Sequence, residues 1–116
     1  MDNTHPHQPL AKPIIIKEHQ AEDAIPYDLL LLADPSRKLI DEYLSEGHFY
    51  KAYLSGAIIG CYVLHETNDE EVEIKNIAVA KEYQGRGVGT MLLEDAEQRA
   101  SAKQMRQIII KTPPKY

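Results

Sequence analysis

Cysteine is nearly absent from this sequence: Cys61 is the only one, so no disulfide can form within the chain. This scarcity favours a reducing compartment, and we expect the protein to be cytoplasmic. Long apolar runs are absent as well. No run approaches the ~20 residues that a membrane-spanning helix needs, and no signal peptide is recognisable, so we expect no association with a membrane.

Positive charge is the minority sign. The chain has 13 Lys and Arg against 18 Asp and Glu, which gives a formal net charge of −5 and a pI near 5.5. This balance argues against nucleic acid as a partner. An acidic surface suits a cationic, amine-bearing substrate, although many cytosolic proteins are equally acidic.

The length of 116 residues suits one domain with one core, and a hydrophobic content of 43% is ordinary for a globular protein. Residues 1–12 contain prolines and histidines without periodicity, so we expect a disordered tail there. The domain itself is then expected over residues 13–116.

The first half of that domain predicts strands and two helices. A β-rich run at 13–18 predicts the first strand, and Pro26 and Asp34 are start signals for two helices. Residues 49–66 predict a β-hairpin around a Ser-Gly turn. Cys61 falls in the middle of its second strand, and we interpret it as a small core residue rather than a nucleophile.

Residues 71–110 carry the clearest pattern: a strand, a glycine-rich turn, a helix and a short strand. In the helical part, apolar residues recur every four positions, at Val88, Leu92, Ala96 and Ala100. Asp95 and Arg99 are expected to pair on its exposed side. A strand–helix–strand order implies a parallel strand pair. The predicted fold class is therefore mixed α/β, a mostly antiparallel sheet with one β-α-β unit.

Three glycines, Gly85, Gly87 and Gly89, stand where this helix begins. The first turn of a helix presents free N–H groups and a positive dipole end, and glycine lets a phosphate approach them closely. The alternative is a tight turn without a ligand. A P-loop is excluded because no lysine follows the glycines, and a dinucleotide fingerprint would need glycine where the chain has Thr90.

The segment 84–89, QGRGVG, resembles the acyl-CoA-binding motif Q/R-x-x-G-x-G/A of the GNAT superfamily of N-acyltransferases. The resemblance implies an N-acetyltransferase that moves an acetyl group from acetyl-CoA to a primary amine of a small molecule or protein, without a metal. The alternative is a non-catalytic acyl-CoA-binding or interaction module derived from such an enzyme. The residues that the resemblance implies for acetyl-CoA are Ile77, Ala78, Val79, Gln84, Gly85, Arg86, Gly87, Val88, Gly89 and Thr90.

The resemblance also implies catalytic groups. Acyl transfer to an amine needs a base for the ammonium proton and a hydrogen-bond donor for the thioester carbonyl. Glu73 matches the position of a glutamate that some members use as the base, and the backbone N–H of Val79 matches the carbonyl donor. The equally weighted alternative is that Glu73 is a surface charge that Lys75 neutralises. Tyr27 and Asp28 belong to the helical region that borders the acceptor site in the family.

The chain stops soon after the expected fifth strand, without the C-terminal helix and strands of that family. The family's usual general acid is a tyrosine in that region, and no motif places Tyr116 in this role. The strand at 105–110 would then be an uncovered sheet edge, so we expect a homo-oligomer.

Overall fold

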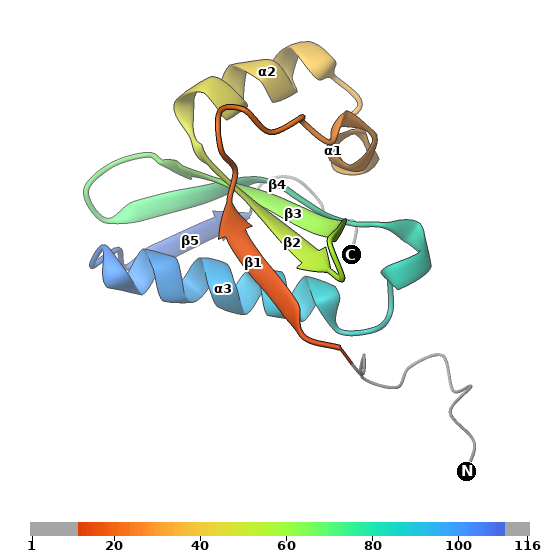
Figure 1. Ribbon diagram of the computed structural model, residues 1–116. Coiled ribbons are helices and arrows are strands. Elements are labelled where there is room, and N and C mark those ends of the chain that lie inside the picture. Colours follow the sequence, from red (N-terminus) through yellow and green to blue (C-terminus); the bar gives the residue numbers. More distant parts are fainter. Residues whose placement is uncertain (1–11, 111–116) are drawn as a thin grey trace.

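The computed structural model describes residues 12–110, and the predictions for residues 1–11 and 111–116 lie outside this part. The described residues form one sheet, three α-helices and a short 3₁₀ helix (Figure 1). In chain order the elements are β1 (Ile14–Glu18), α1 (Tyr27–Ala33), α2 (Arg37–Glu46), β2 (His48–Leu54), β3 (Ala57–Glu66), β4 (Glu71–Val79), η1 (Lys81–Tyr83), α3 (Val88–Ala102) and β5 (Gln107–Ile110).

The sheet has the strand order β1-β2-β3-β4-β5. Its first three pairs are antiparallel, whereas β4 and β5 are parallel and are connected through α3. Ser55 and Gly56 join β2 to β3 with φ angles of 51° and 85°. Left-handed backbone at both turn positions matches the right-handed twist of a hairpin. The mixed, mostly antiparallel fold predicted from the sequence is confirmed.

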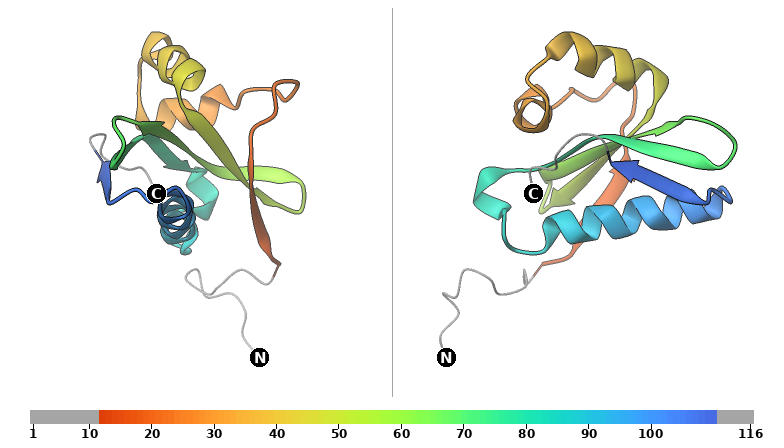
Figure 2. Two further views of the ribbon diagram at one scale, coloured as in Figure 1. Left: turned by 90° about the vertical axis from the view of Figure 1, so that its left-hand side faces the viewer. Right: turned by 180° about the vertical axis from the view of Figure 1, so that it is seen from behind.

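The sheet separates two helical layers, with α1 and α2 on one face and α3 on the other (Figures 1 and 2). The buried residues of α3 include the apolar series predicted from the sequence, Val88, Leu92, Ala96 and Ala100. On the opposite face, Cys61 is fully buried in the cluster under α1 and α2. Burial raises the pKa of its thiol, as expected for a core residue and not for a nucleophile.

Asp95 and Arg99 do pair, but the prediction that they lie on an exposed side of the helix is wrong. Arg99 Nε donates to Asp95 Oδ2 at 2.7 Å, and the two side chains are 34% and 20% exposed. Tyr62, which is fully buried on β3, donates its hydroxyl to the same carboxylate oxygen at 2.6 Å. Burial and this hydrogen bond raise the pKa of Tyr62. The pair faces the sheet because it provides the partner that a buried hydroxyl needs.

β4 contains an irregularity that changes which residues face α3. Val63 pairs with Asn76 and Leu64 with Ile74, so Lys75 is an extra residue in β4. Ile74 and Ile77 both pack in the cluster against α3 although they are three residues apart. Strict alternation would turn Ile77 to the other face. The bulge therefore keeps both halves of β4 packed on α3.

Candidate functional site

One edge of β4 opens towards its C-terminal end. β5 pairs with β4 only as far as Ile74, and no other described strand lies on that side. The Ala80 N–H donates to Ile59 O of β3 at 2.8 Å. Backbone groups alternate along a strand, so Ile77 and Val79 face the open side and Ala78 faces β3. Of these three predicted cofactor contacts, Ile77 and Val79 have backbone groups directed to the open side.

The glycine-rich loop leads from this strand end into α3. Gly87 is the N-cap of α3 with a φ of 89°, and no side chain caps this helix start. The first turn holds no acidic residue, and a Cβ built on Gly87 would meet nothing within 4 Å. The N–H groups of Val88, Gly89 and Thr90 therefore have no intrahelical acceptor. A positive helix end without a carboxylate or a capping side chain suits a phosphate group.

Gln84 and Arg86 have different surroundings in this loop. Gln84 Nε2 donates to Val79 O at 3.0 Å, so the side chain ties the loop to the end of β4. Arg86 lies with its guanidinium carbon 5.8 Å from the centre of the Tyr83 ring. Its buried Nε has no partner among the described residues. A cation beside the helix start fits the pyrophosphate of CoA, and the direct contacts of Gln84, Gly85 and Arg86 with the cofactor stay predictions.

Glu73 is not a solvated surface residue. It is 4% exposed, and its Oε1 lies 3.2 Å from Lys75 Nζ. The alternative interpretation, that Glu73 is a surface charge, predicted its ion pair with Lys75 but not its burial. Glu73 and Val79 lie opposite His65 and Gly60, which are five positions apart on β3 because of the extra residue in β4. Their separation is therefore about 17 Å at ~3.3 Å per residue. A base acts at about 3 Å or through a water, so Glu73 cannot serve directly at a carbonyl held by Val79.

A cavity of about 590 Å³ lies between α1, the start of β3 and η1. It contains Tyr27 and Asp28, the two residues that the sequence placed near an acceptor. Tyr27 donates its hydroxyl to Asp41 at 2.6 Å, so this group also joins α1 to α2. The remaining lining residues are Ile25, Pro26, Leu29, Leu32, Ile58, Ala80, Lys81 and Glu82. We call this space the α1 cavity; through Ala80 it adjoins the end of β4, next to the residues predicted to bind the cofactor.

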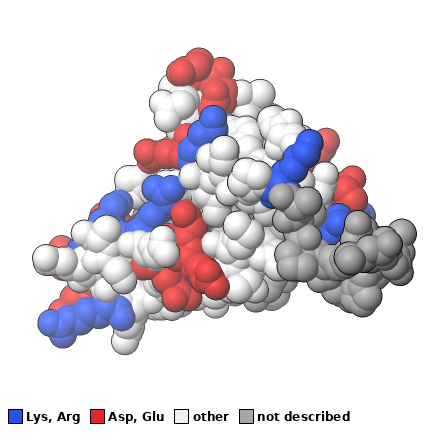
Figure 3. Space-filling view, turned by 60° about the horizontal axis from the view of Figure 1, so that its bottom comes forward, with Lys and Arg blue, Asp and Glu red and all other residues white. Residues whose placement is uncertain are grey.

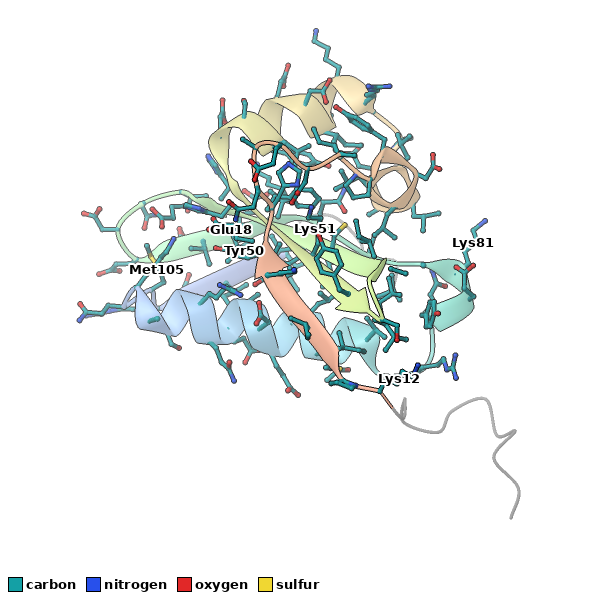
Figure 4. The ribbon with its side chains drawn as sticks, viewed as in Figure 1. Lys12, Glu18, Tyr50, Lys51, Lys81 and Met105 are labelled. Atoms are coloured by element: carbon teal, nitrogen blue, oxygen red, sulfur yellow. The ribbon has the colours of Figure 1, made fainter. Side chains whose placement is uncertain are left out.

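A buried cation under the loop before α1 was missed by the sequence analysis. Lys51 of β2, labelled in Figure 4, is 1% exposed. Its Nζ contacts Asp23 Oδ2 at 3.0 Å. Burial lowers the pKa of Lys51, but hydrogen bonds to Tyr53 and Asp23 outweigh it and the net shift is upward. The Gln20 N–H and Lys51 lower the pKa of Asp23. The sequence signal for this buried cation was a lysine within the apolar run of β2. Through Asp23, Lys51 positions the loop that leads to the α1 cavity.

Other site types find little support in the described residues. Among residues 12–110, no group of three or more His, Cys, Asp and Glu side chains could hold a metal ion. No helix in this part of the chain is both long and apolar enough to cross a membrane. Acidic and basic side chains both occur on the face that Figure 3 shows, which includes the α3 side.

The comparisons with known proteins agree with this geometry. The model of the Acetyltransferase (GNAT) family matches residues 15–114, and the chain belongs to this family. A GNAT family acetyltransferase from Elizabethkingia anophelis, solved with acetyl-CoA bound, is 50% identical with a TM-score of 0.82, over 84% of this chain and 63% of that one. A Bacillus subtilis acetyltransferase solved with CoA is 40% identical with a TM-score of 0.79, over 84% and 64%.

Among curated proteins, the uncharacterized N-acetyltransferase YvbK of Bacillus subtilis is 49% identical over 74 residues. The match covers 64% of this chain and 48% of that protein. The chain thus spans about half the length of this relative.

Proposed function

We propose that the protein transfers the acetyl group of acetyl-CoA to a primary amine. The observation that carries the proposal is the uncapped, glycine-rich start of α3 beside the open edge of β4. The helix start suits a phosphate group. The strand edge offers backbone donors and acceptors to an extended amide-containing arm such as pantetheine. Acetyl-CoA supplies the activated thioester bond.

The residues of the chain then position the reactants and handle protons. The first turn of α3, with Arg86, binds the pyrophosphate, and Ile77 and Val79 hold the pantetheine arm through their backbone. The amine approaches from the α1 cavity. In the reaction, its nitrogen forms a bond to the acyl carbon, the carbon–sulfur bond breaks, one amine proton passes to a base and the thiolate is protonated.

We assign the carbonyl contact to the N–H of Ile77 instead of Val79. Both N–H groups face the open edge of β4, but Ile77 lies nearer to Glu73: the two residues are opposite Tyr62 and His65 of β3, about 10 Å apart along the strand. An extended glutamate side chain and bridging water can cover such a gap. With this assignment Glu73 stays a candidate base. To accept the proton of the amine, its carboxylate must give up its contact with Lys75.

Replacing Glu73 with Gln tests this role. The rate at neutral pH should fall about a hundredfold or more. Glu71→Gln is the matched control, since Glu71 is two residues away on the same strand and its carboxylate accepts from Asn68. An unchanged pH–rate profile in Glu73→Gln would remove Glu73 from the mechanism.

The proposal as a whole is tested by the release of free CoA from acetyl-CoA. The panel of acceptors consists of phenethylamine, spermidine, free lysine and a lysine-containing peptide. At least one amine should raise CoA release above the rate without acceptor. Tight CoA binding without any amine-dependent release would instead establish the alternative, a non-catalytic acyl-CoA-binding module.

We also propose that the chain self-associates through β5. Within residues 12–110 this strand pairs only with β4, and Ile110 is 42% exposed at its end. An uncovered strand edge offers unpaired backbone groups to a second copy. Light scattering over a dilution series should show a mass that rises with concentration, and a monomer at all concentrations would contradict the proposal.

A further inference from the structure

α1 is too short to hold its own position. It has seven residues, and its N-cap, Pro26, provides no side-chain hydrogen bond. Isolated helices of fewer than about 12 residues are unstable in water, so contacts with other elements must fix α1. Its position matters because α1 supplies one wall of the α1 cavity, through residues from Pro26 to Leu32.

Most contacts of α1 with the sheet are apolar. Leu29 and Leu30 pack with the buried residues of α2, β3 and β4. Apolar packing has little directional preference, so it holds the helix against the sheet without fixing its exact height or rotation. The hydrogen bond from Tyr27 to Asp41 is directional, but it joins α1 only to α2.

Asn76 makes the directional contact between both helices and β4. It is fully buried, and its Nδ2 donates to Leu30 O of α1 at 3.0 Å and to the Tyr43 hydroxyl of α2 at 2.9 Å. One side-chain amide thus binds two helices at once. It lies on the cofactor strand, directly before Ile77.

The network continues into the linker between the helices. Tyr43 donates its hydroxyl to Asp34 Oδ2 at 3.2 Å, and Asp34 Oδ1 accepts the Ser36 N–H at 3.0 Å. Burial raises the pKa of Tyr43 to about 12, so the hydroxyl keeps its proton and stays a donor at neutral pH. The order of donors and acceptors from Asn76 to Ser36 is therefore fixed, while Asn76 Oδ1 is buried without a partner among the described residues.

We propose that Asn76 is a positioning residue for the acceptor amine. It sets the separation between α1, which lines the α1 cavity, and the stretch of β4 that holds the thioester. The proposal rests on the proposed function for the identity of the reaction. The structural part, that Asn76 fixes α1 and α2 as a unit, does not depend on it.

The test uses Asn76→Leu, which removes both donors at similar size, and Tyr43→Phe, which removes one partner. In folded Asn76→Leu, the KM for the fastest amine of the panel should rise about tenfold or more, and the Kd for CoA should stay within threefold. Tyr43→Phe should show a smaller change in the same direction. Ser45→Ala is the control within α2, because the one bond of its hydroxyl among the described residues is to Glu42 O of the same helix.

Hydrogen exchange separates positioning from general stabilisation. In both variants the amides of α1 and α2 should exchange faster while those of α3 keep their protection. Equal acceleration in α3 would show a merely global loss of stability and overturn the proposal, as would an unchanged amine KM. If no amine is acetylated, the proposed function fails. The hydrogen-exchange rates and the CoA affinity then still decide whether Asn76 fixes α1. If Asn76→Leu does not fold, Tyr43→Phe carries the test.

Discussion

Removing one hydroxyl group should measure how firmly α3 is held on the sheet. Tyr62→Phe deletes the donor of the 2.6 Å bond to Asp95 and leaves the ring in place. A hydrogen bond to a charged group contributes ~1.5–3 kcal/mol. Asp95 is 20% exposed and keeps Arg99, so water and the guanidinium partly compensate. We expect a loss of about 1.5–2 kcal/mol, in the lower part of that range.

Urea unfolding at pH 7 measures this loss, and for a domain of this size it corresponds to a fall in Tm of roughly 6–9 °C. Tyr50→Phe is the matched control. Its ring stacks on that of Tyr62 at 4.9 Å and is also buried, at 4% exposed, but the described residues offer its hydroxyl no hydrogen bond. The control should lose less than about 0.5 kcal/mol. Equal losses in the two variants would refute the reasoning, because ring packing and not the hydrogen bond would then explain the effect.

Two further predictions concern close packing and acid. Gly60→Ala should destabilise by about 1–3 kcal/mol in urea unfolding, because the new Cβ would lie 3.1 Å from Leu92 Cδ1 under α3; an unchanged midpoint would contradict it. The lowered pKa of Asp23 means that its contribution is present above its ordinary value of 3.8 and is lost as the pH falls through the lower value of the folded state. Asp23→Asn should therefore lower Tm at pH 7, by leaving the buried Lys51 charge without its carboxylate, and should flatten the fall of Tm below pH 4. A wild-type acid profile in Asp23→Asn would refute this.

The local parts of the fold were predictable from the sequence. The series from Val88 to Ala100 predicts α3, and the glycines at its start predict the uncapped helix end, because both depend on spacing within a few residues. The meander and the crossover follow from the order of these local patterns.

Contacts between distant segments were not predictable. Asn76 reaches Leu30 across 46 positions, and Tyr62 reaches Asp95 across 33. A buried amide or hydroxyl looks like any polar residue in a strand until its partner is placed. The bulge at Lys75 likewise depends on the pairing with β3, and the extra residue changes which side chains face α3. Tertiary pairing decides these features, and local propensity does not.

Titration calorimetry with CoA tests the central claim, the phosphate site at the start of α3. Gly87 and Gly56 form a matched pair, since their φ angles are 89° and 85° and a Cβ at either meets nothing within 4 Å. Glutamate therefore introduces equal charge and similar backbone strain at both positions, but only Gly87 adjoins the helix start. We predict that Gly87→Glu weakens CoA binding at least tenfold, or ~1.4 kcal/mol, and that Gly56→Glu binds like the wild type. Unchanged affinity in a folded Gly87→Glu protein, or an equal loss in both variants, would contradict the account.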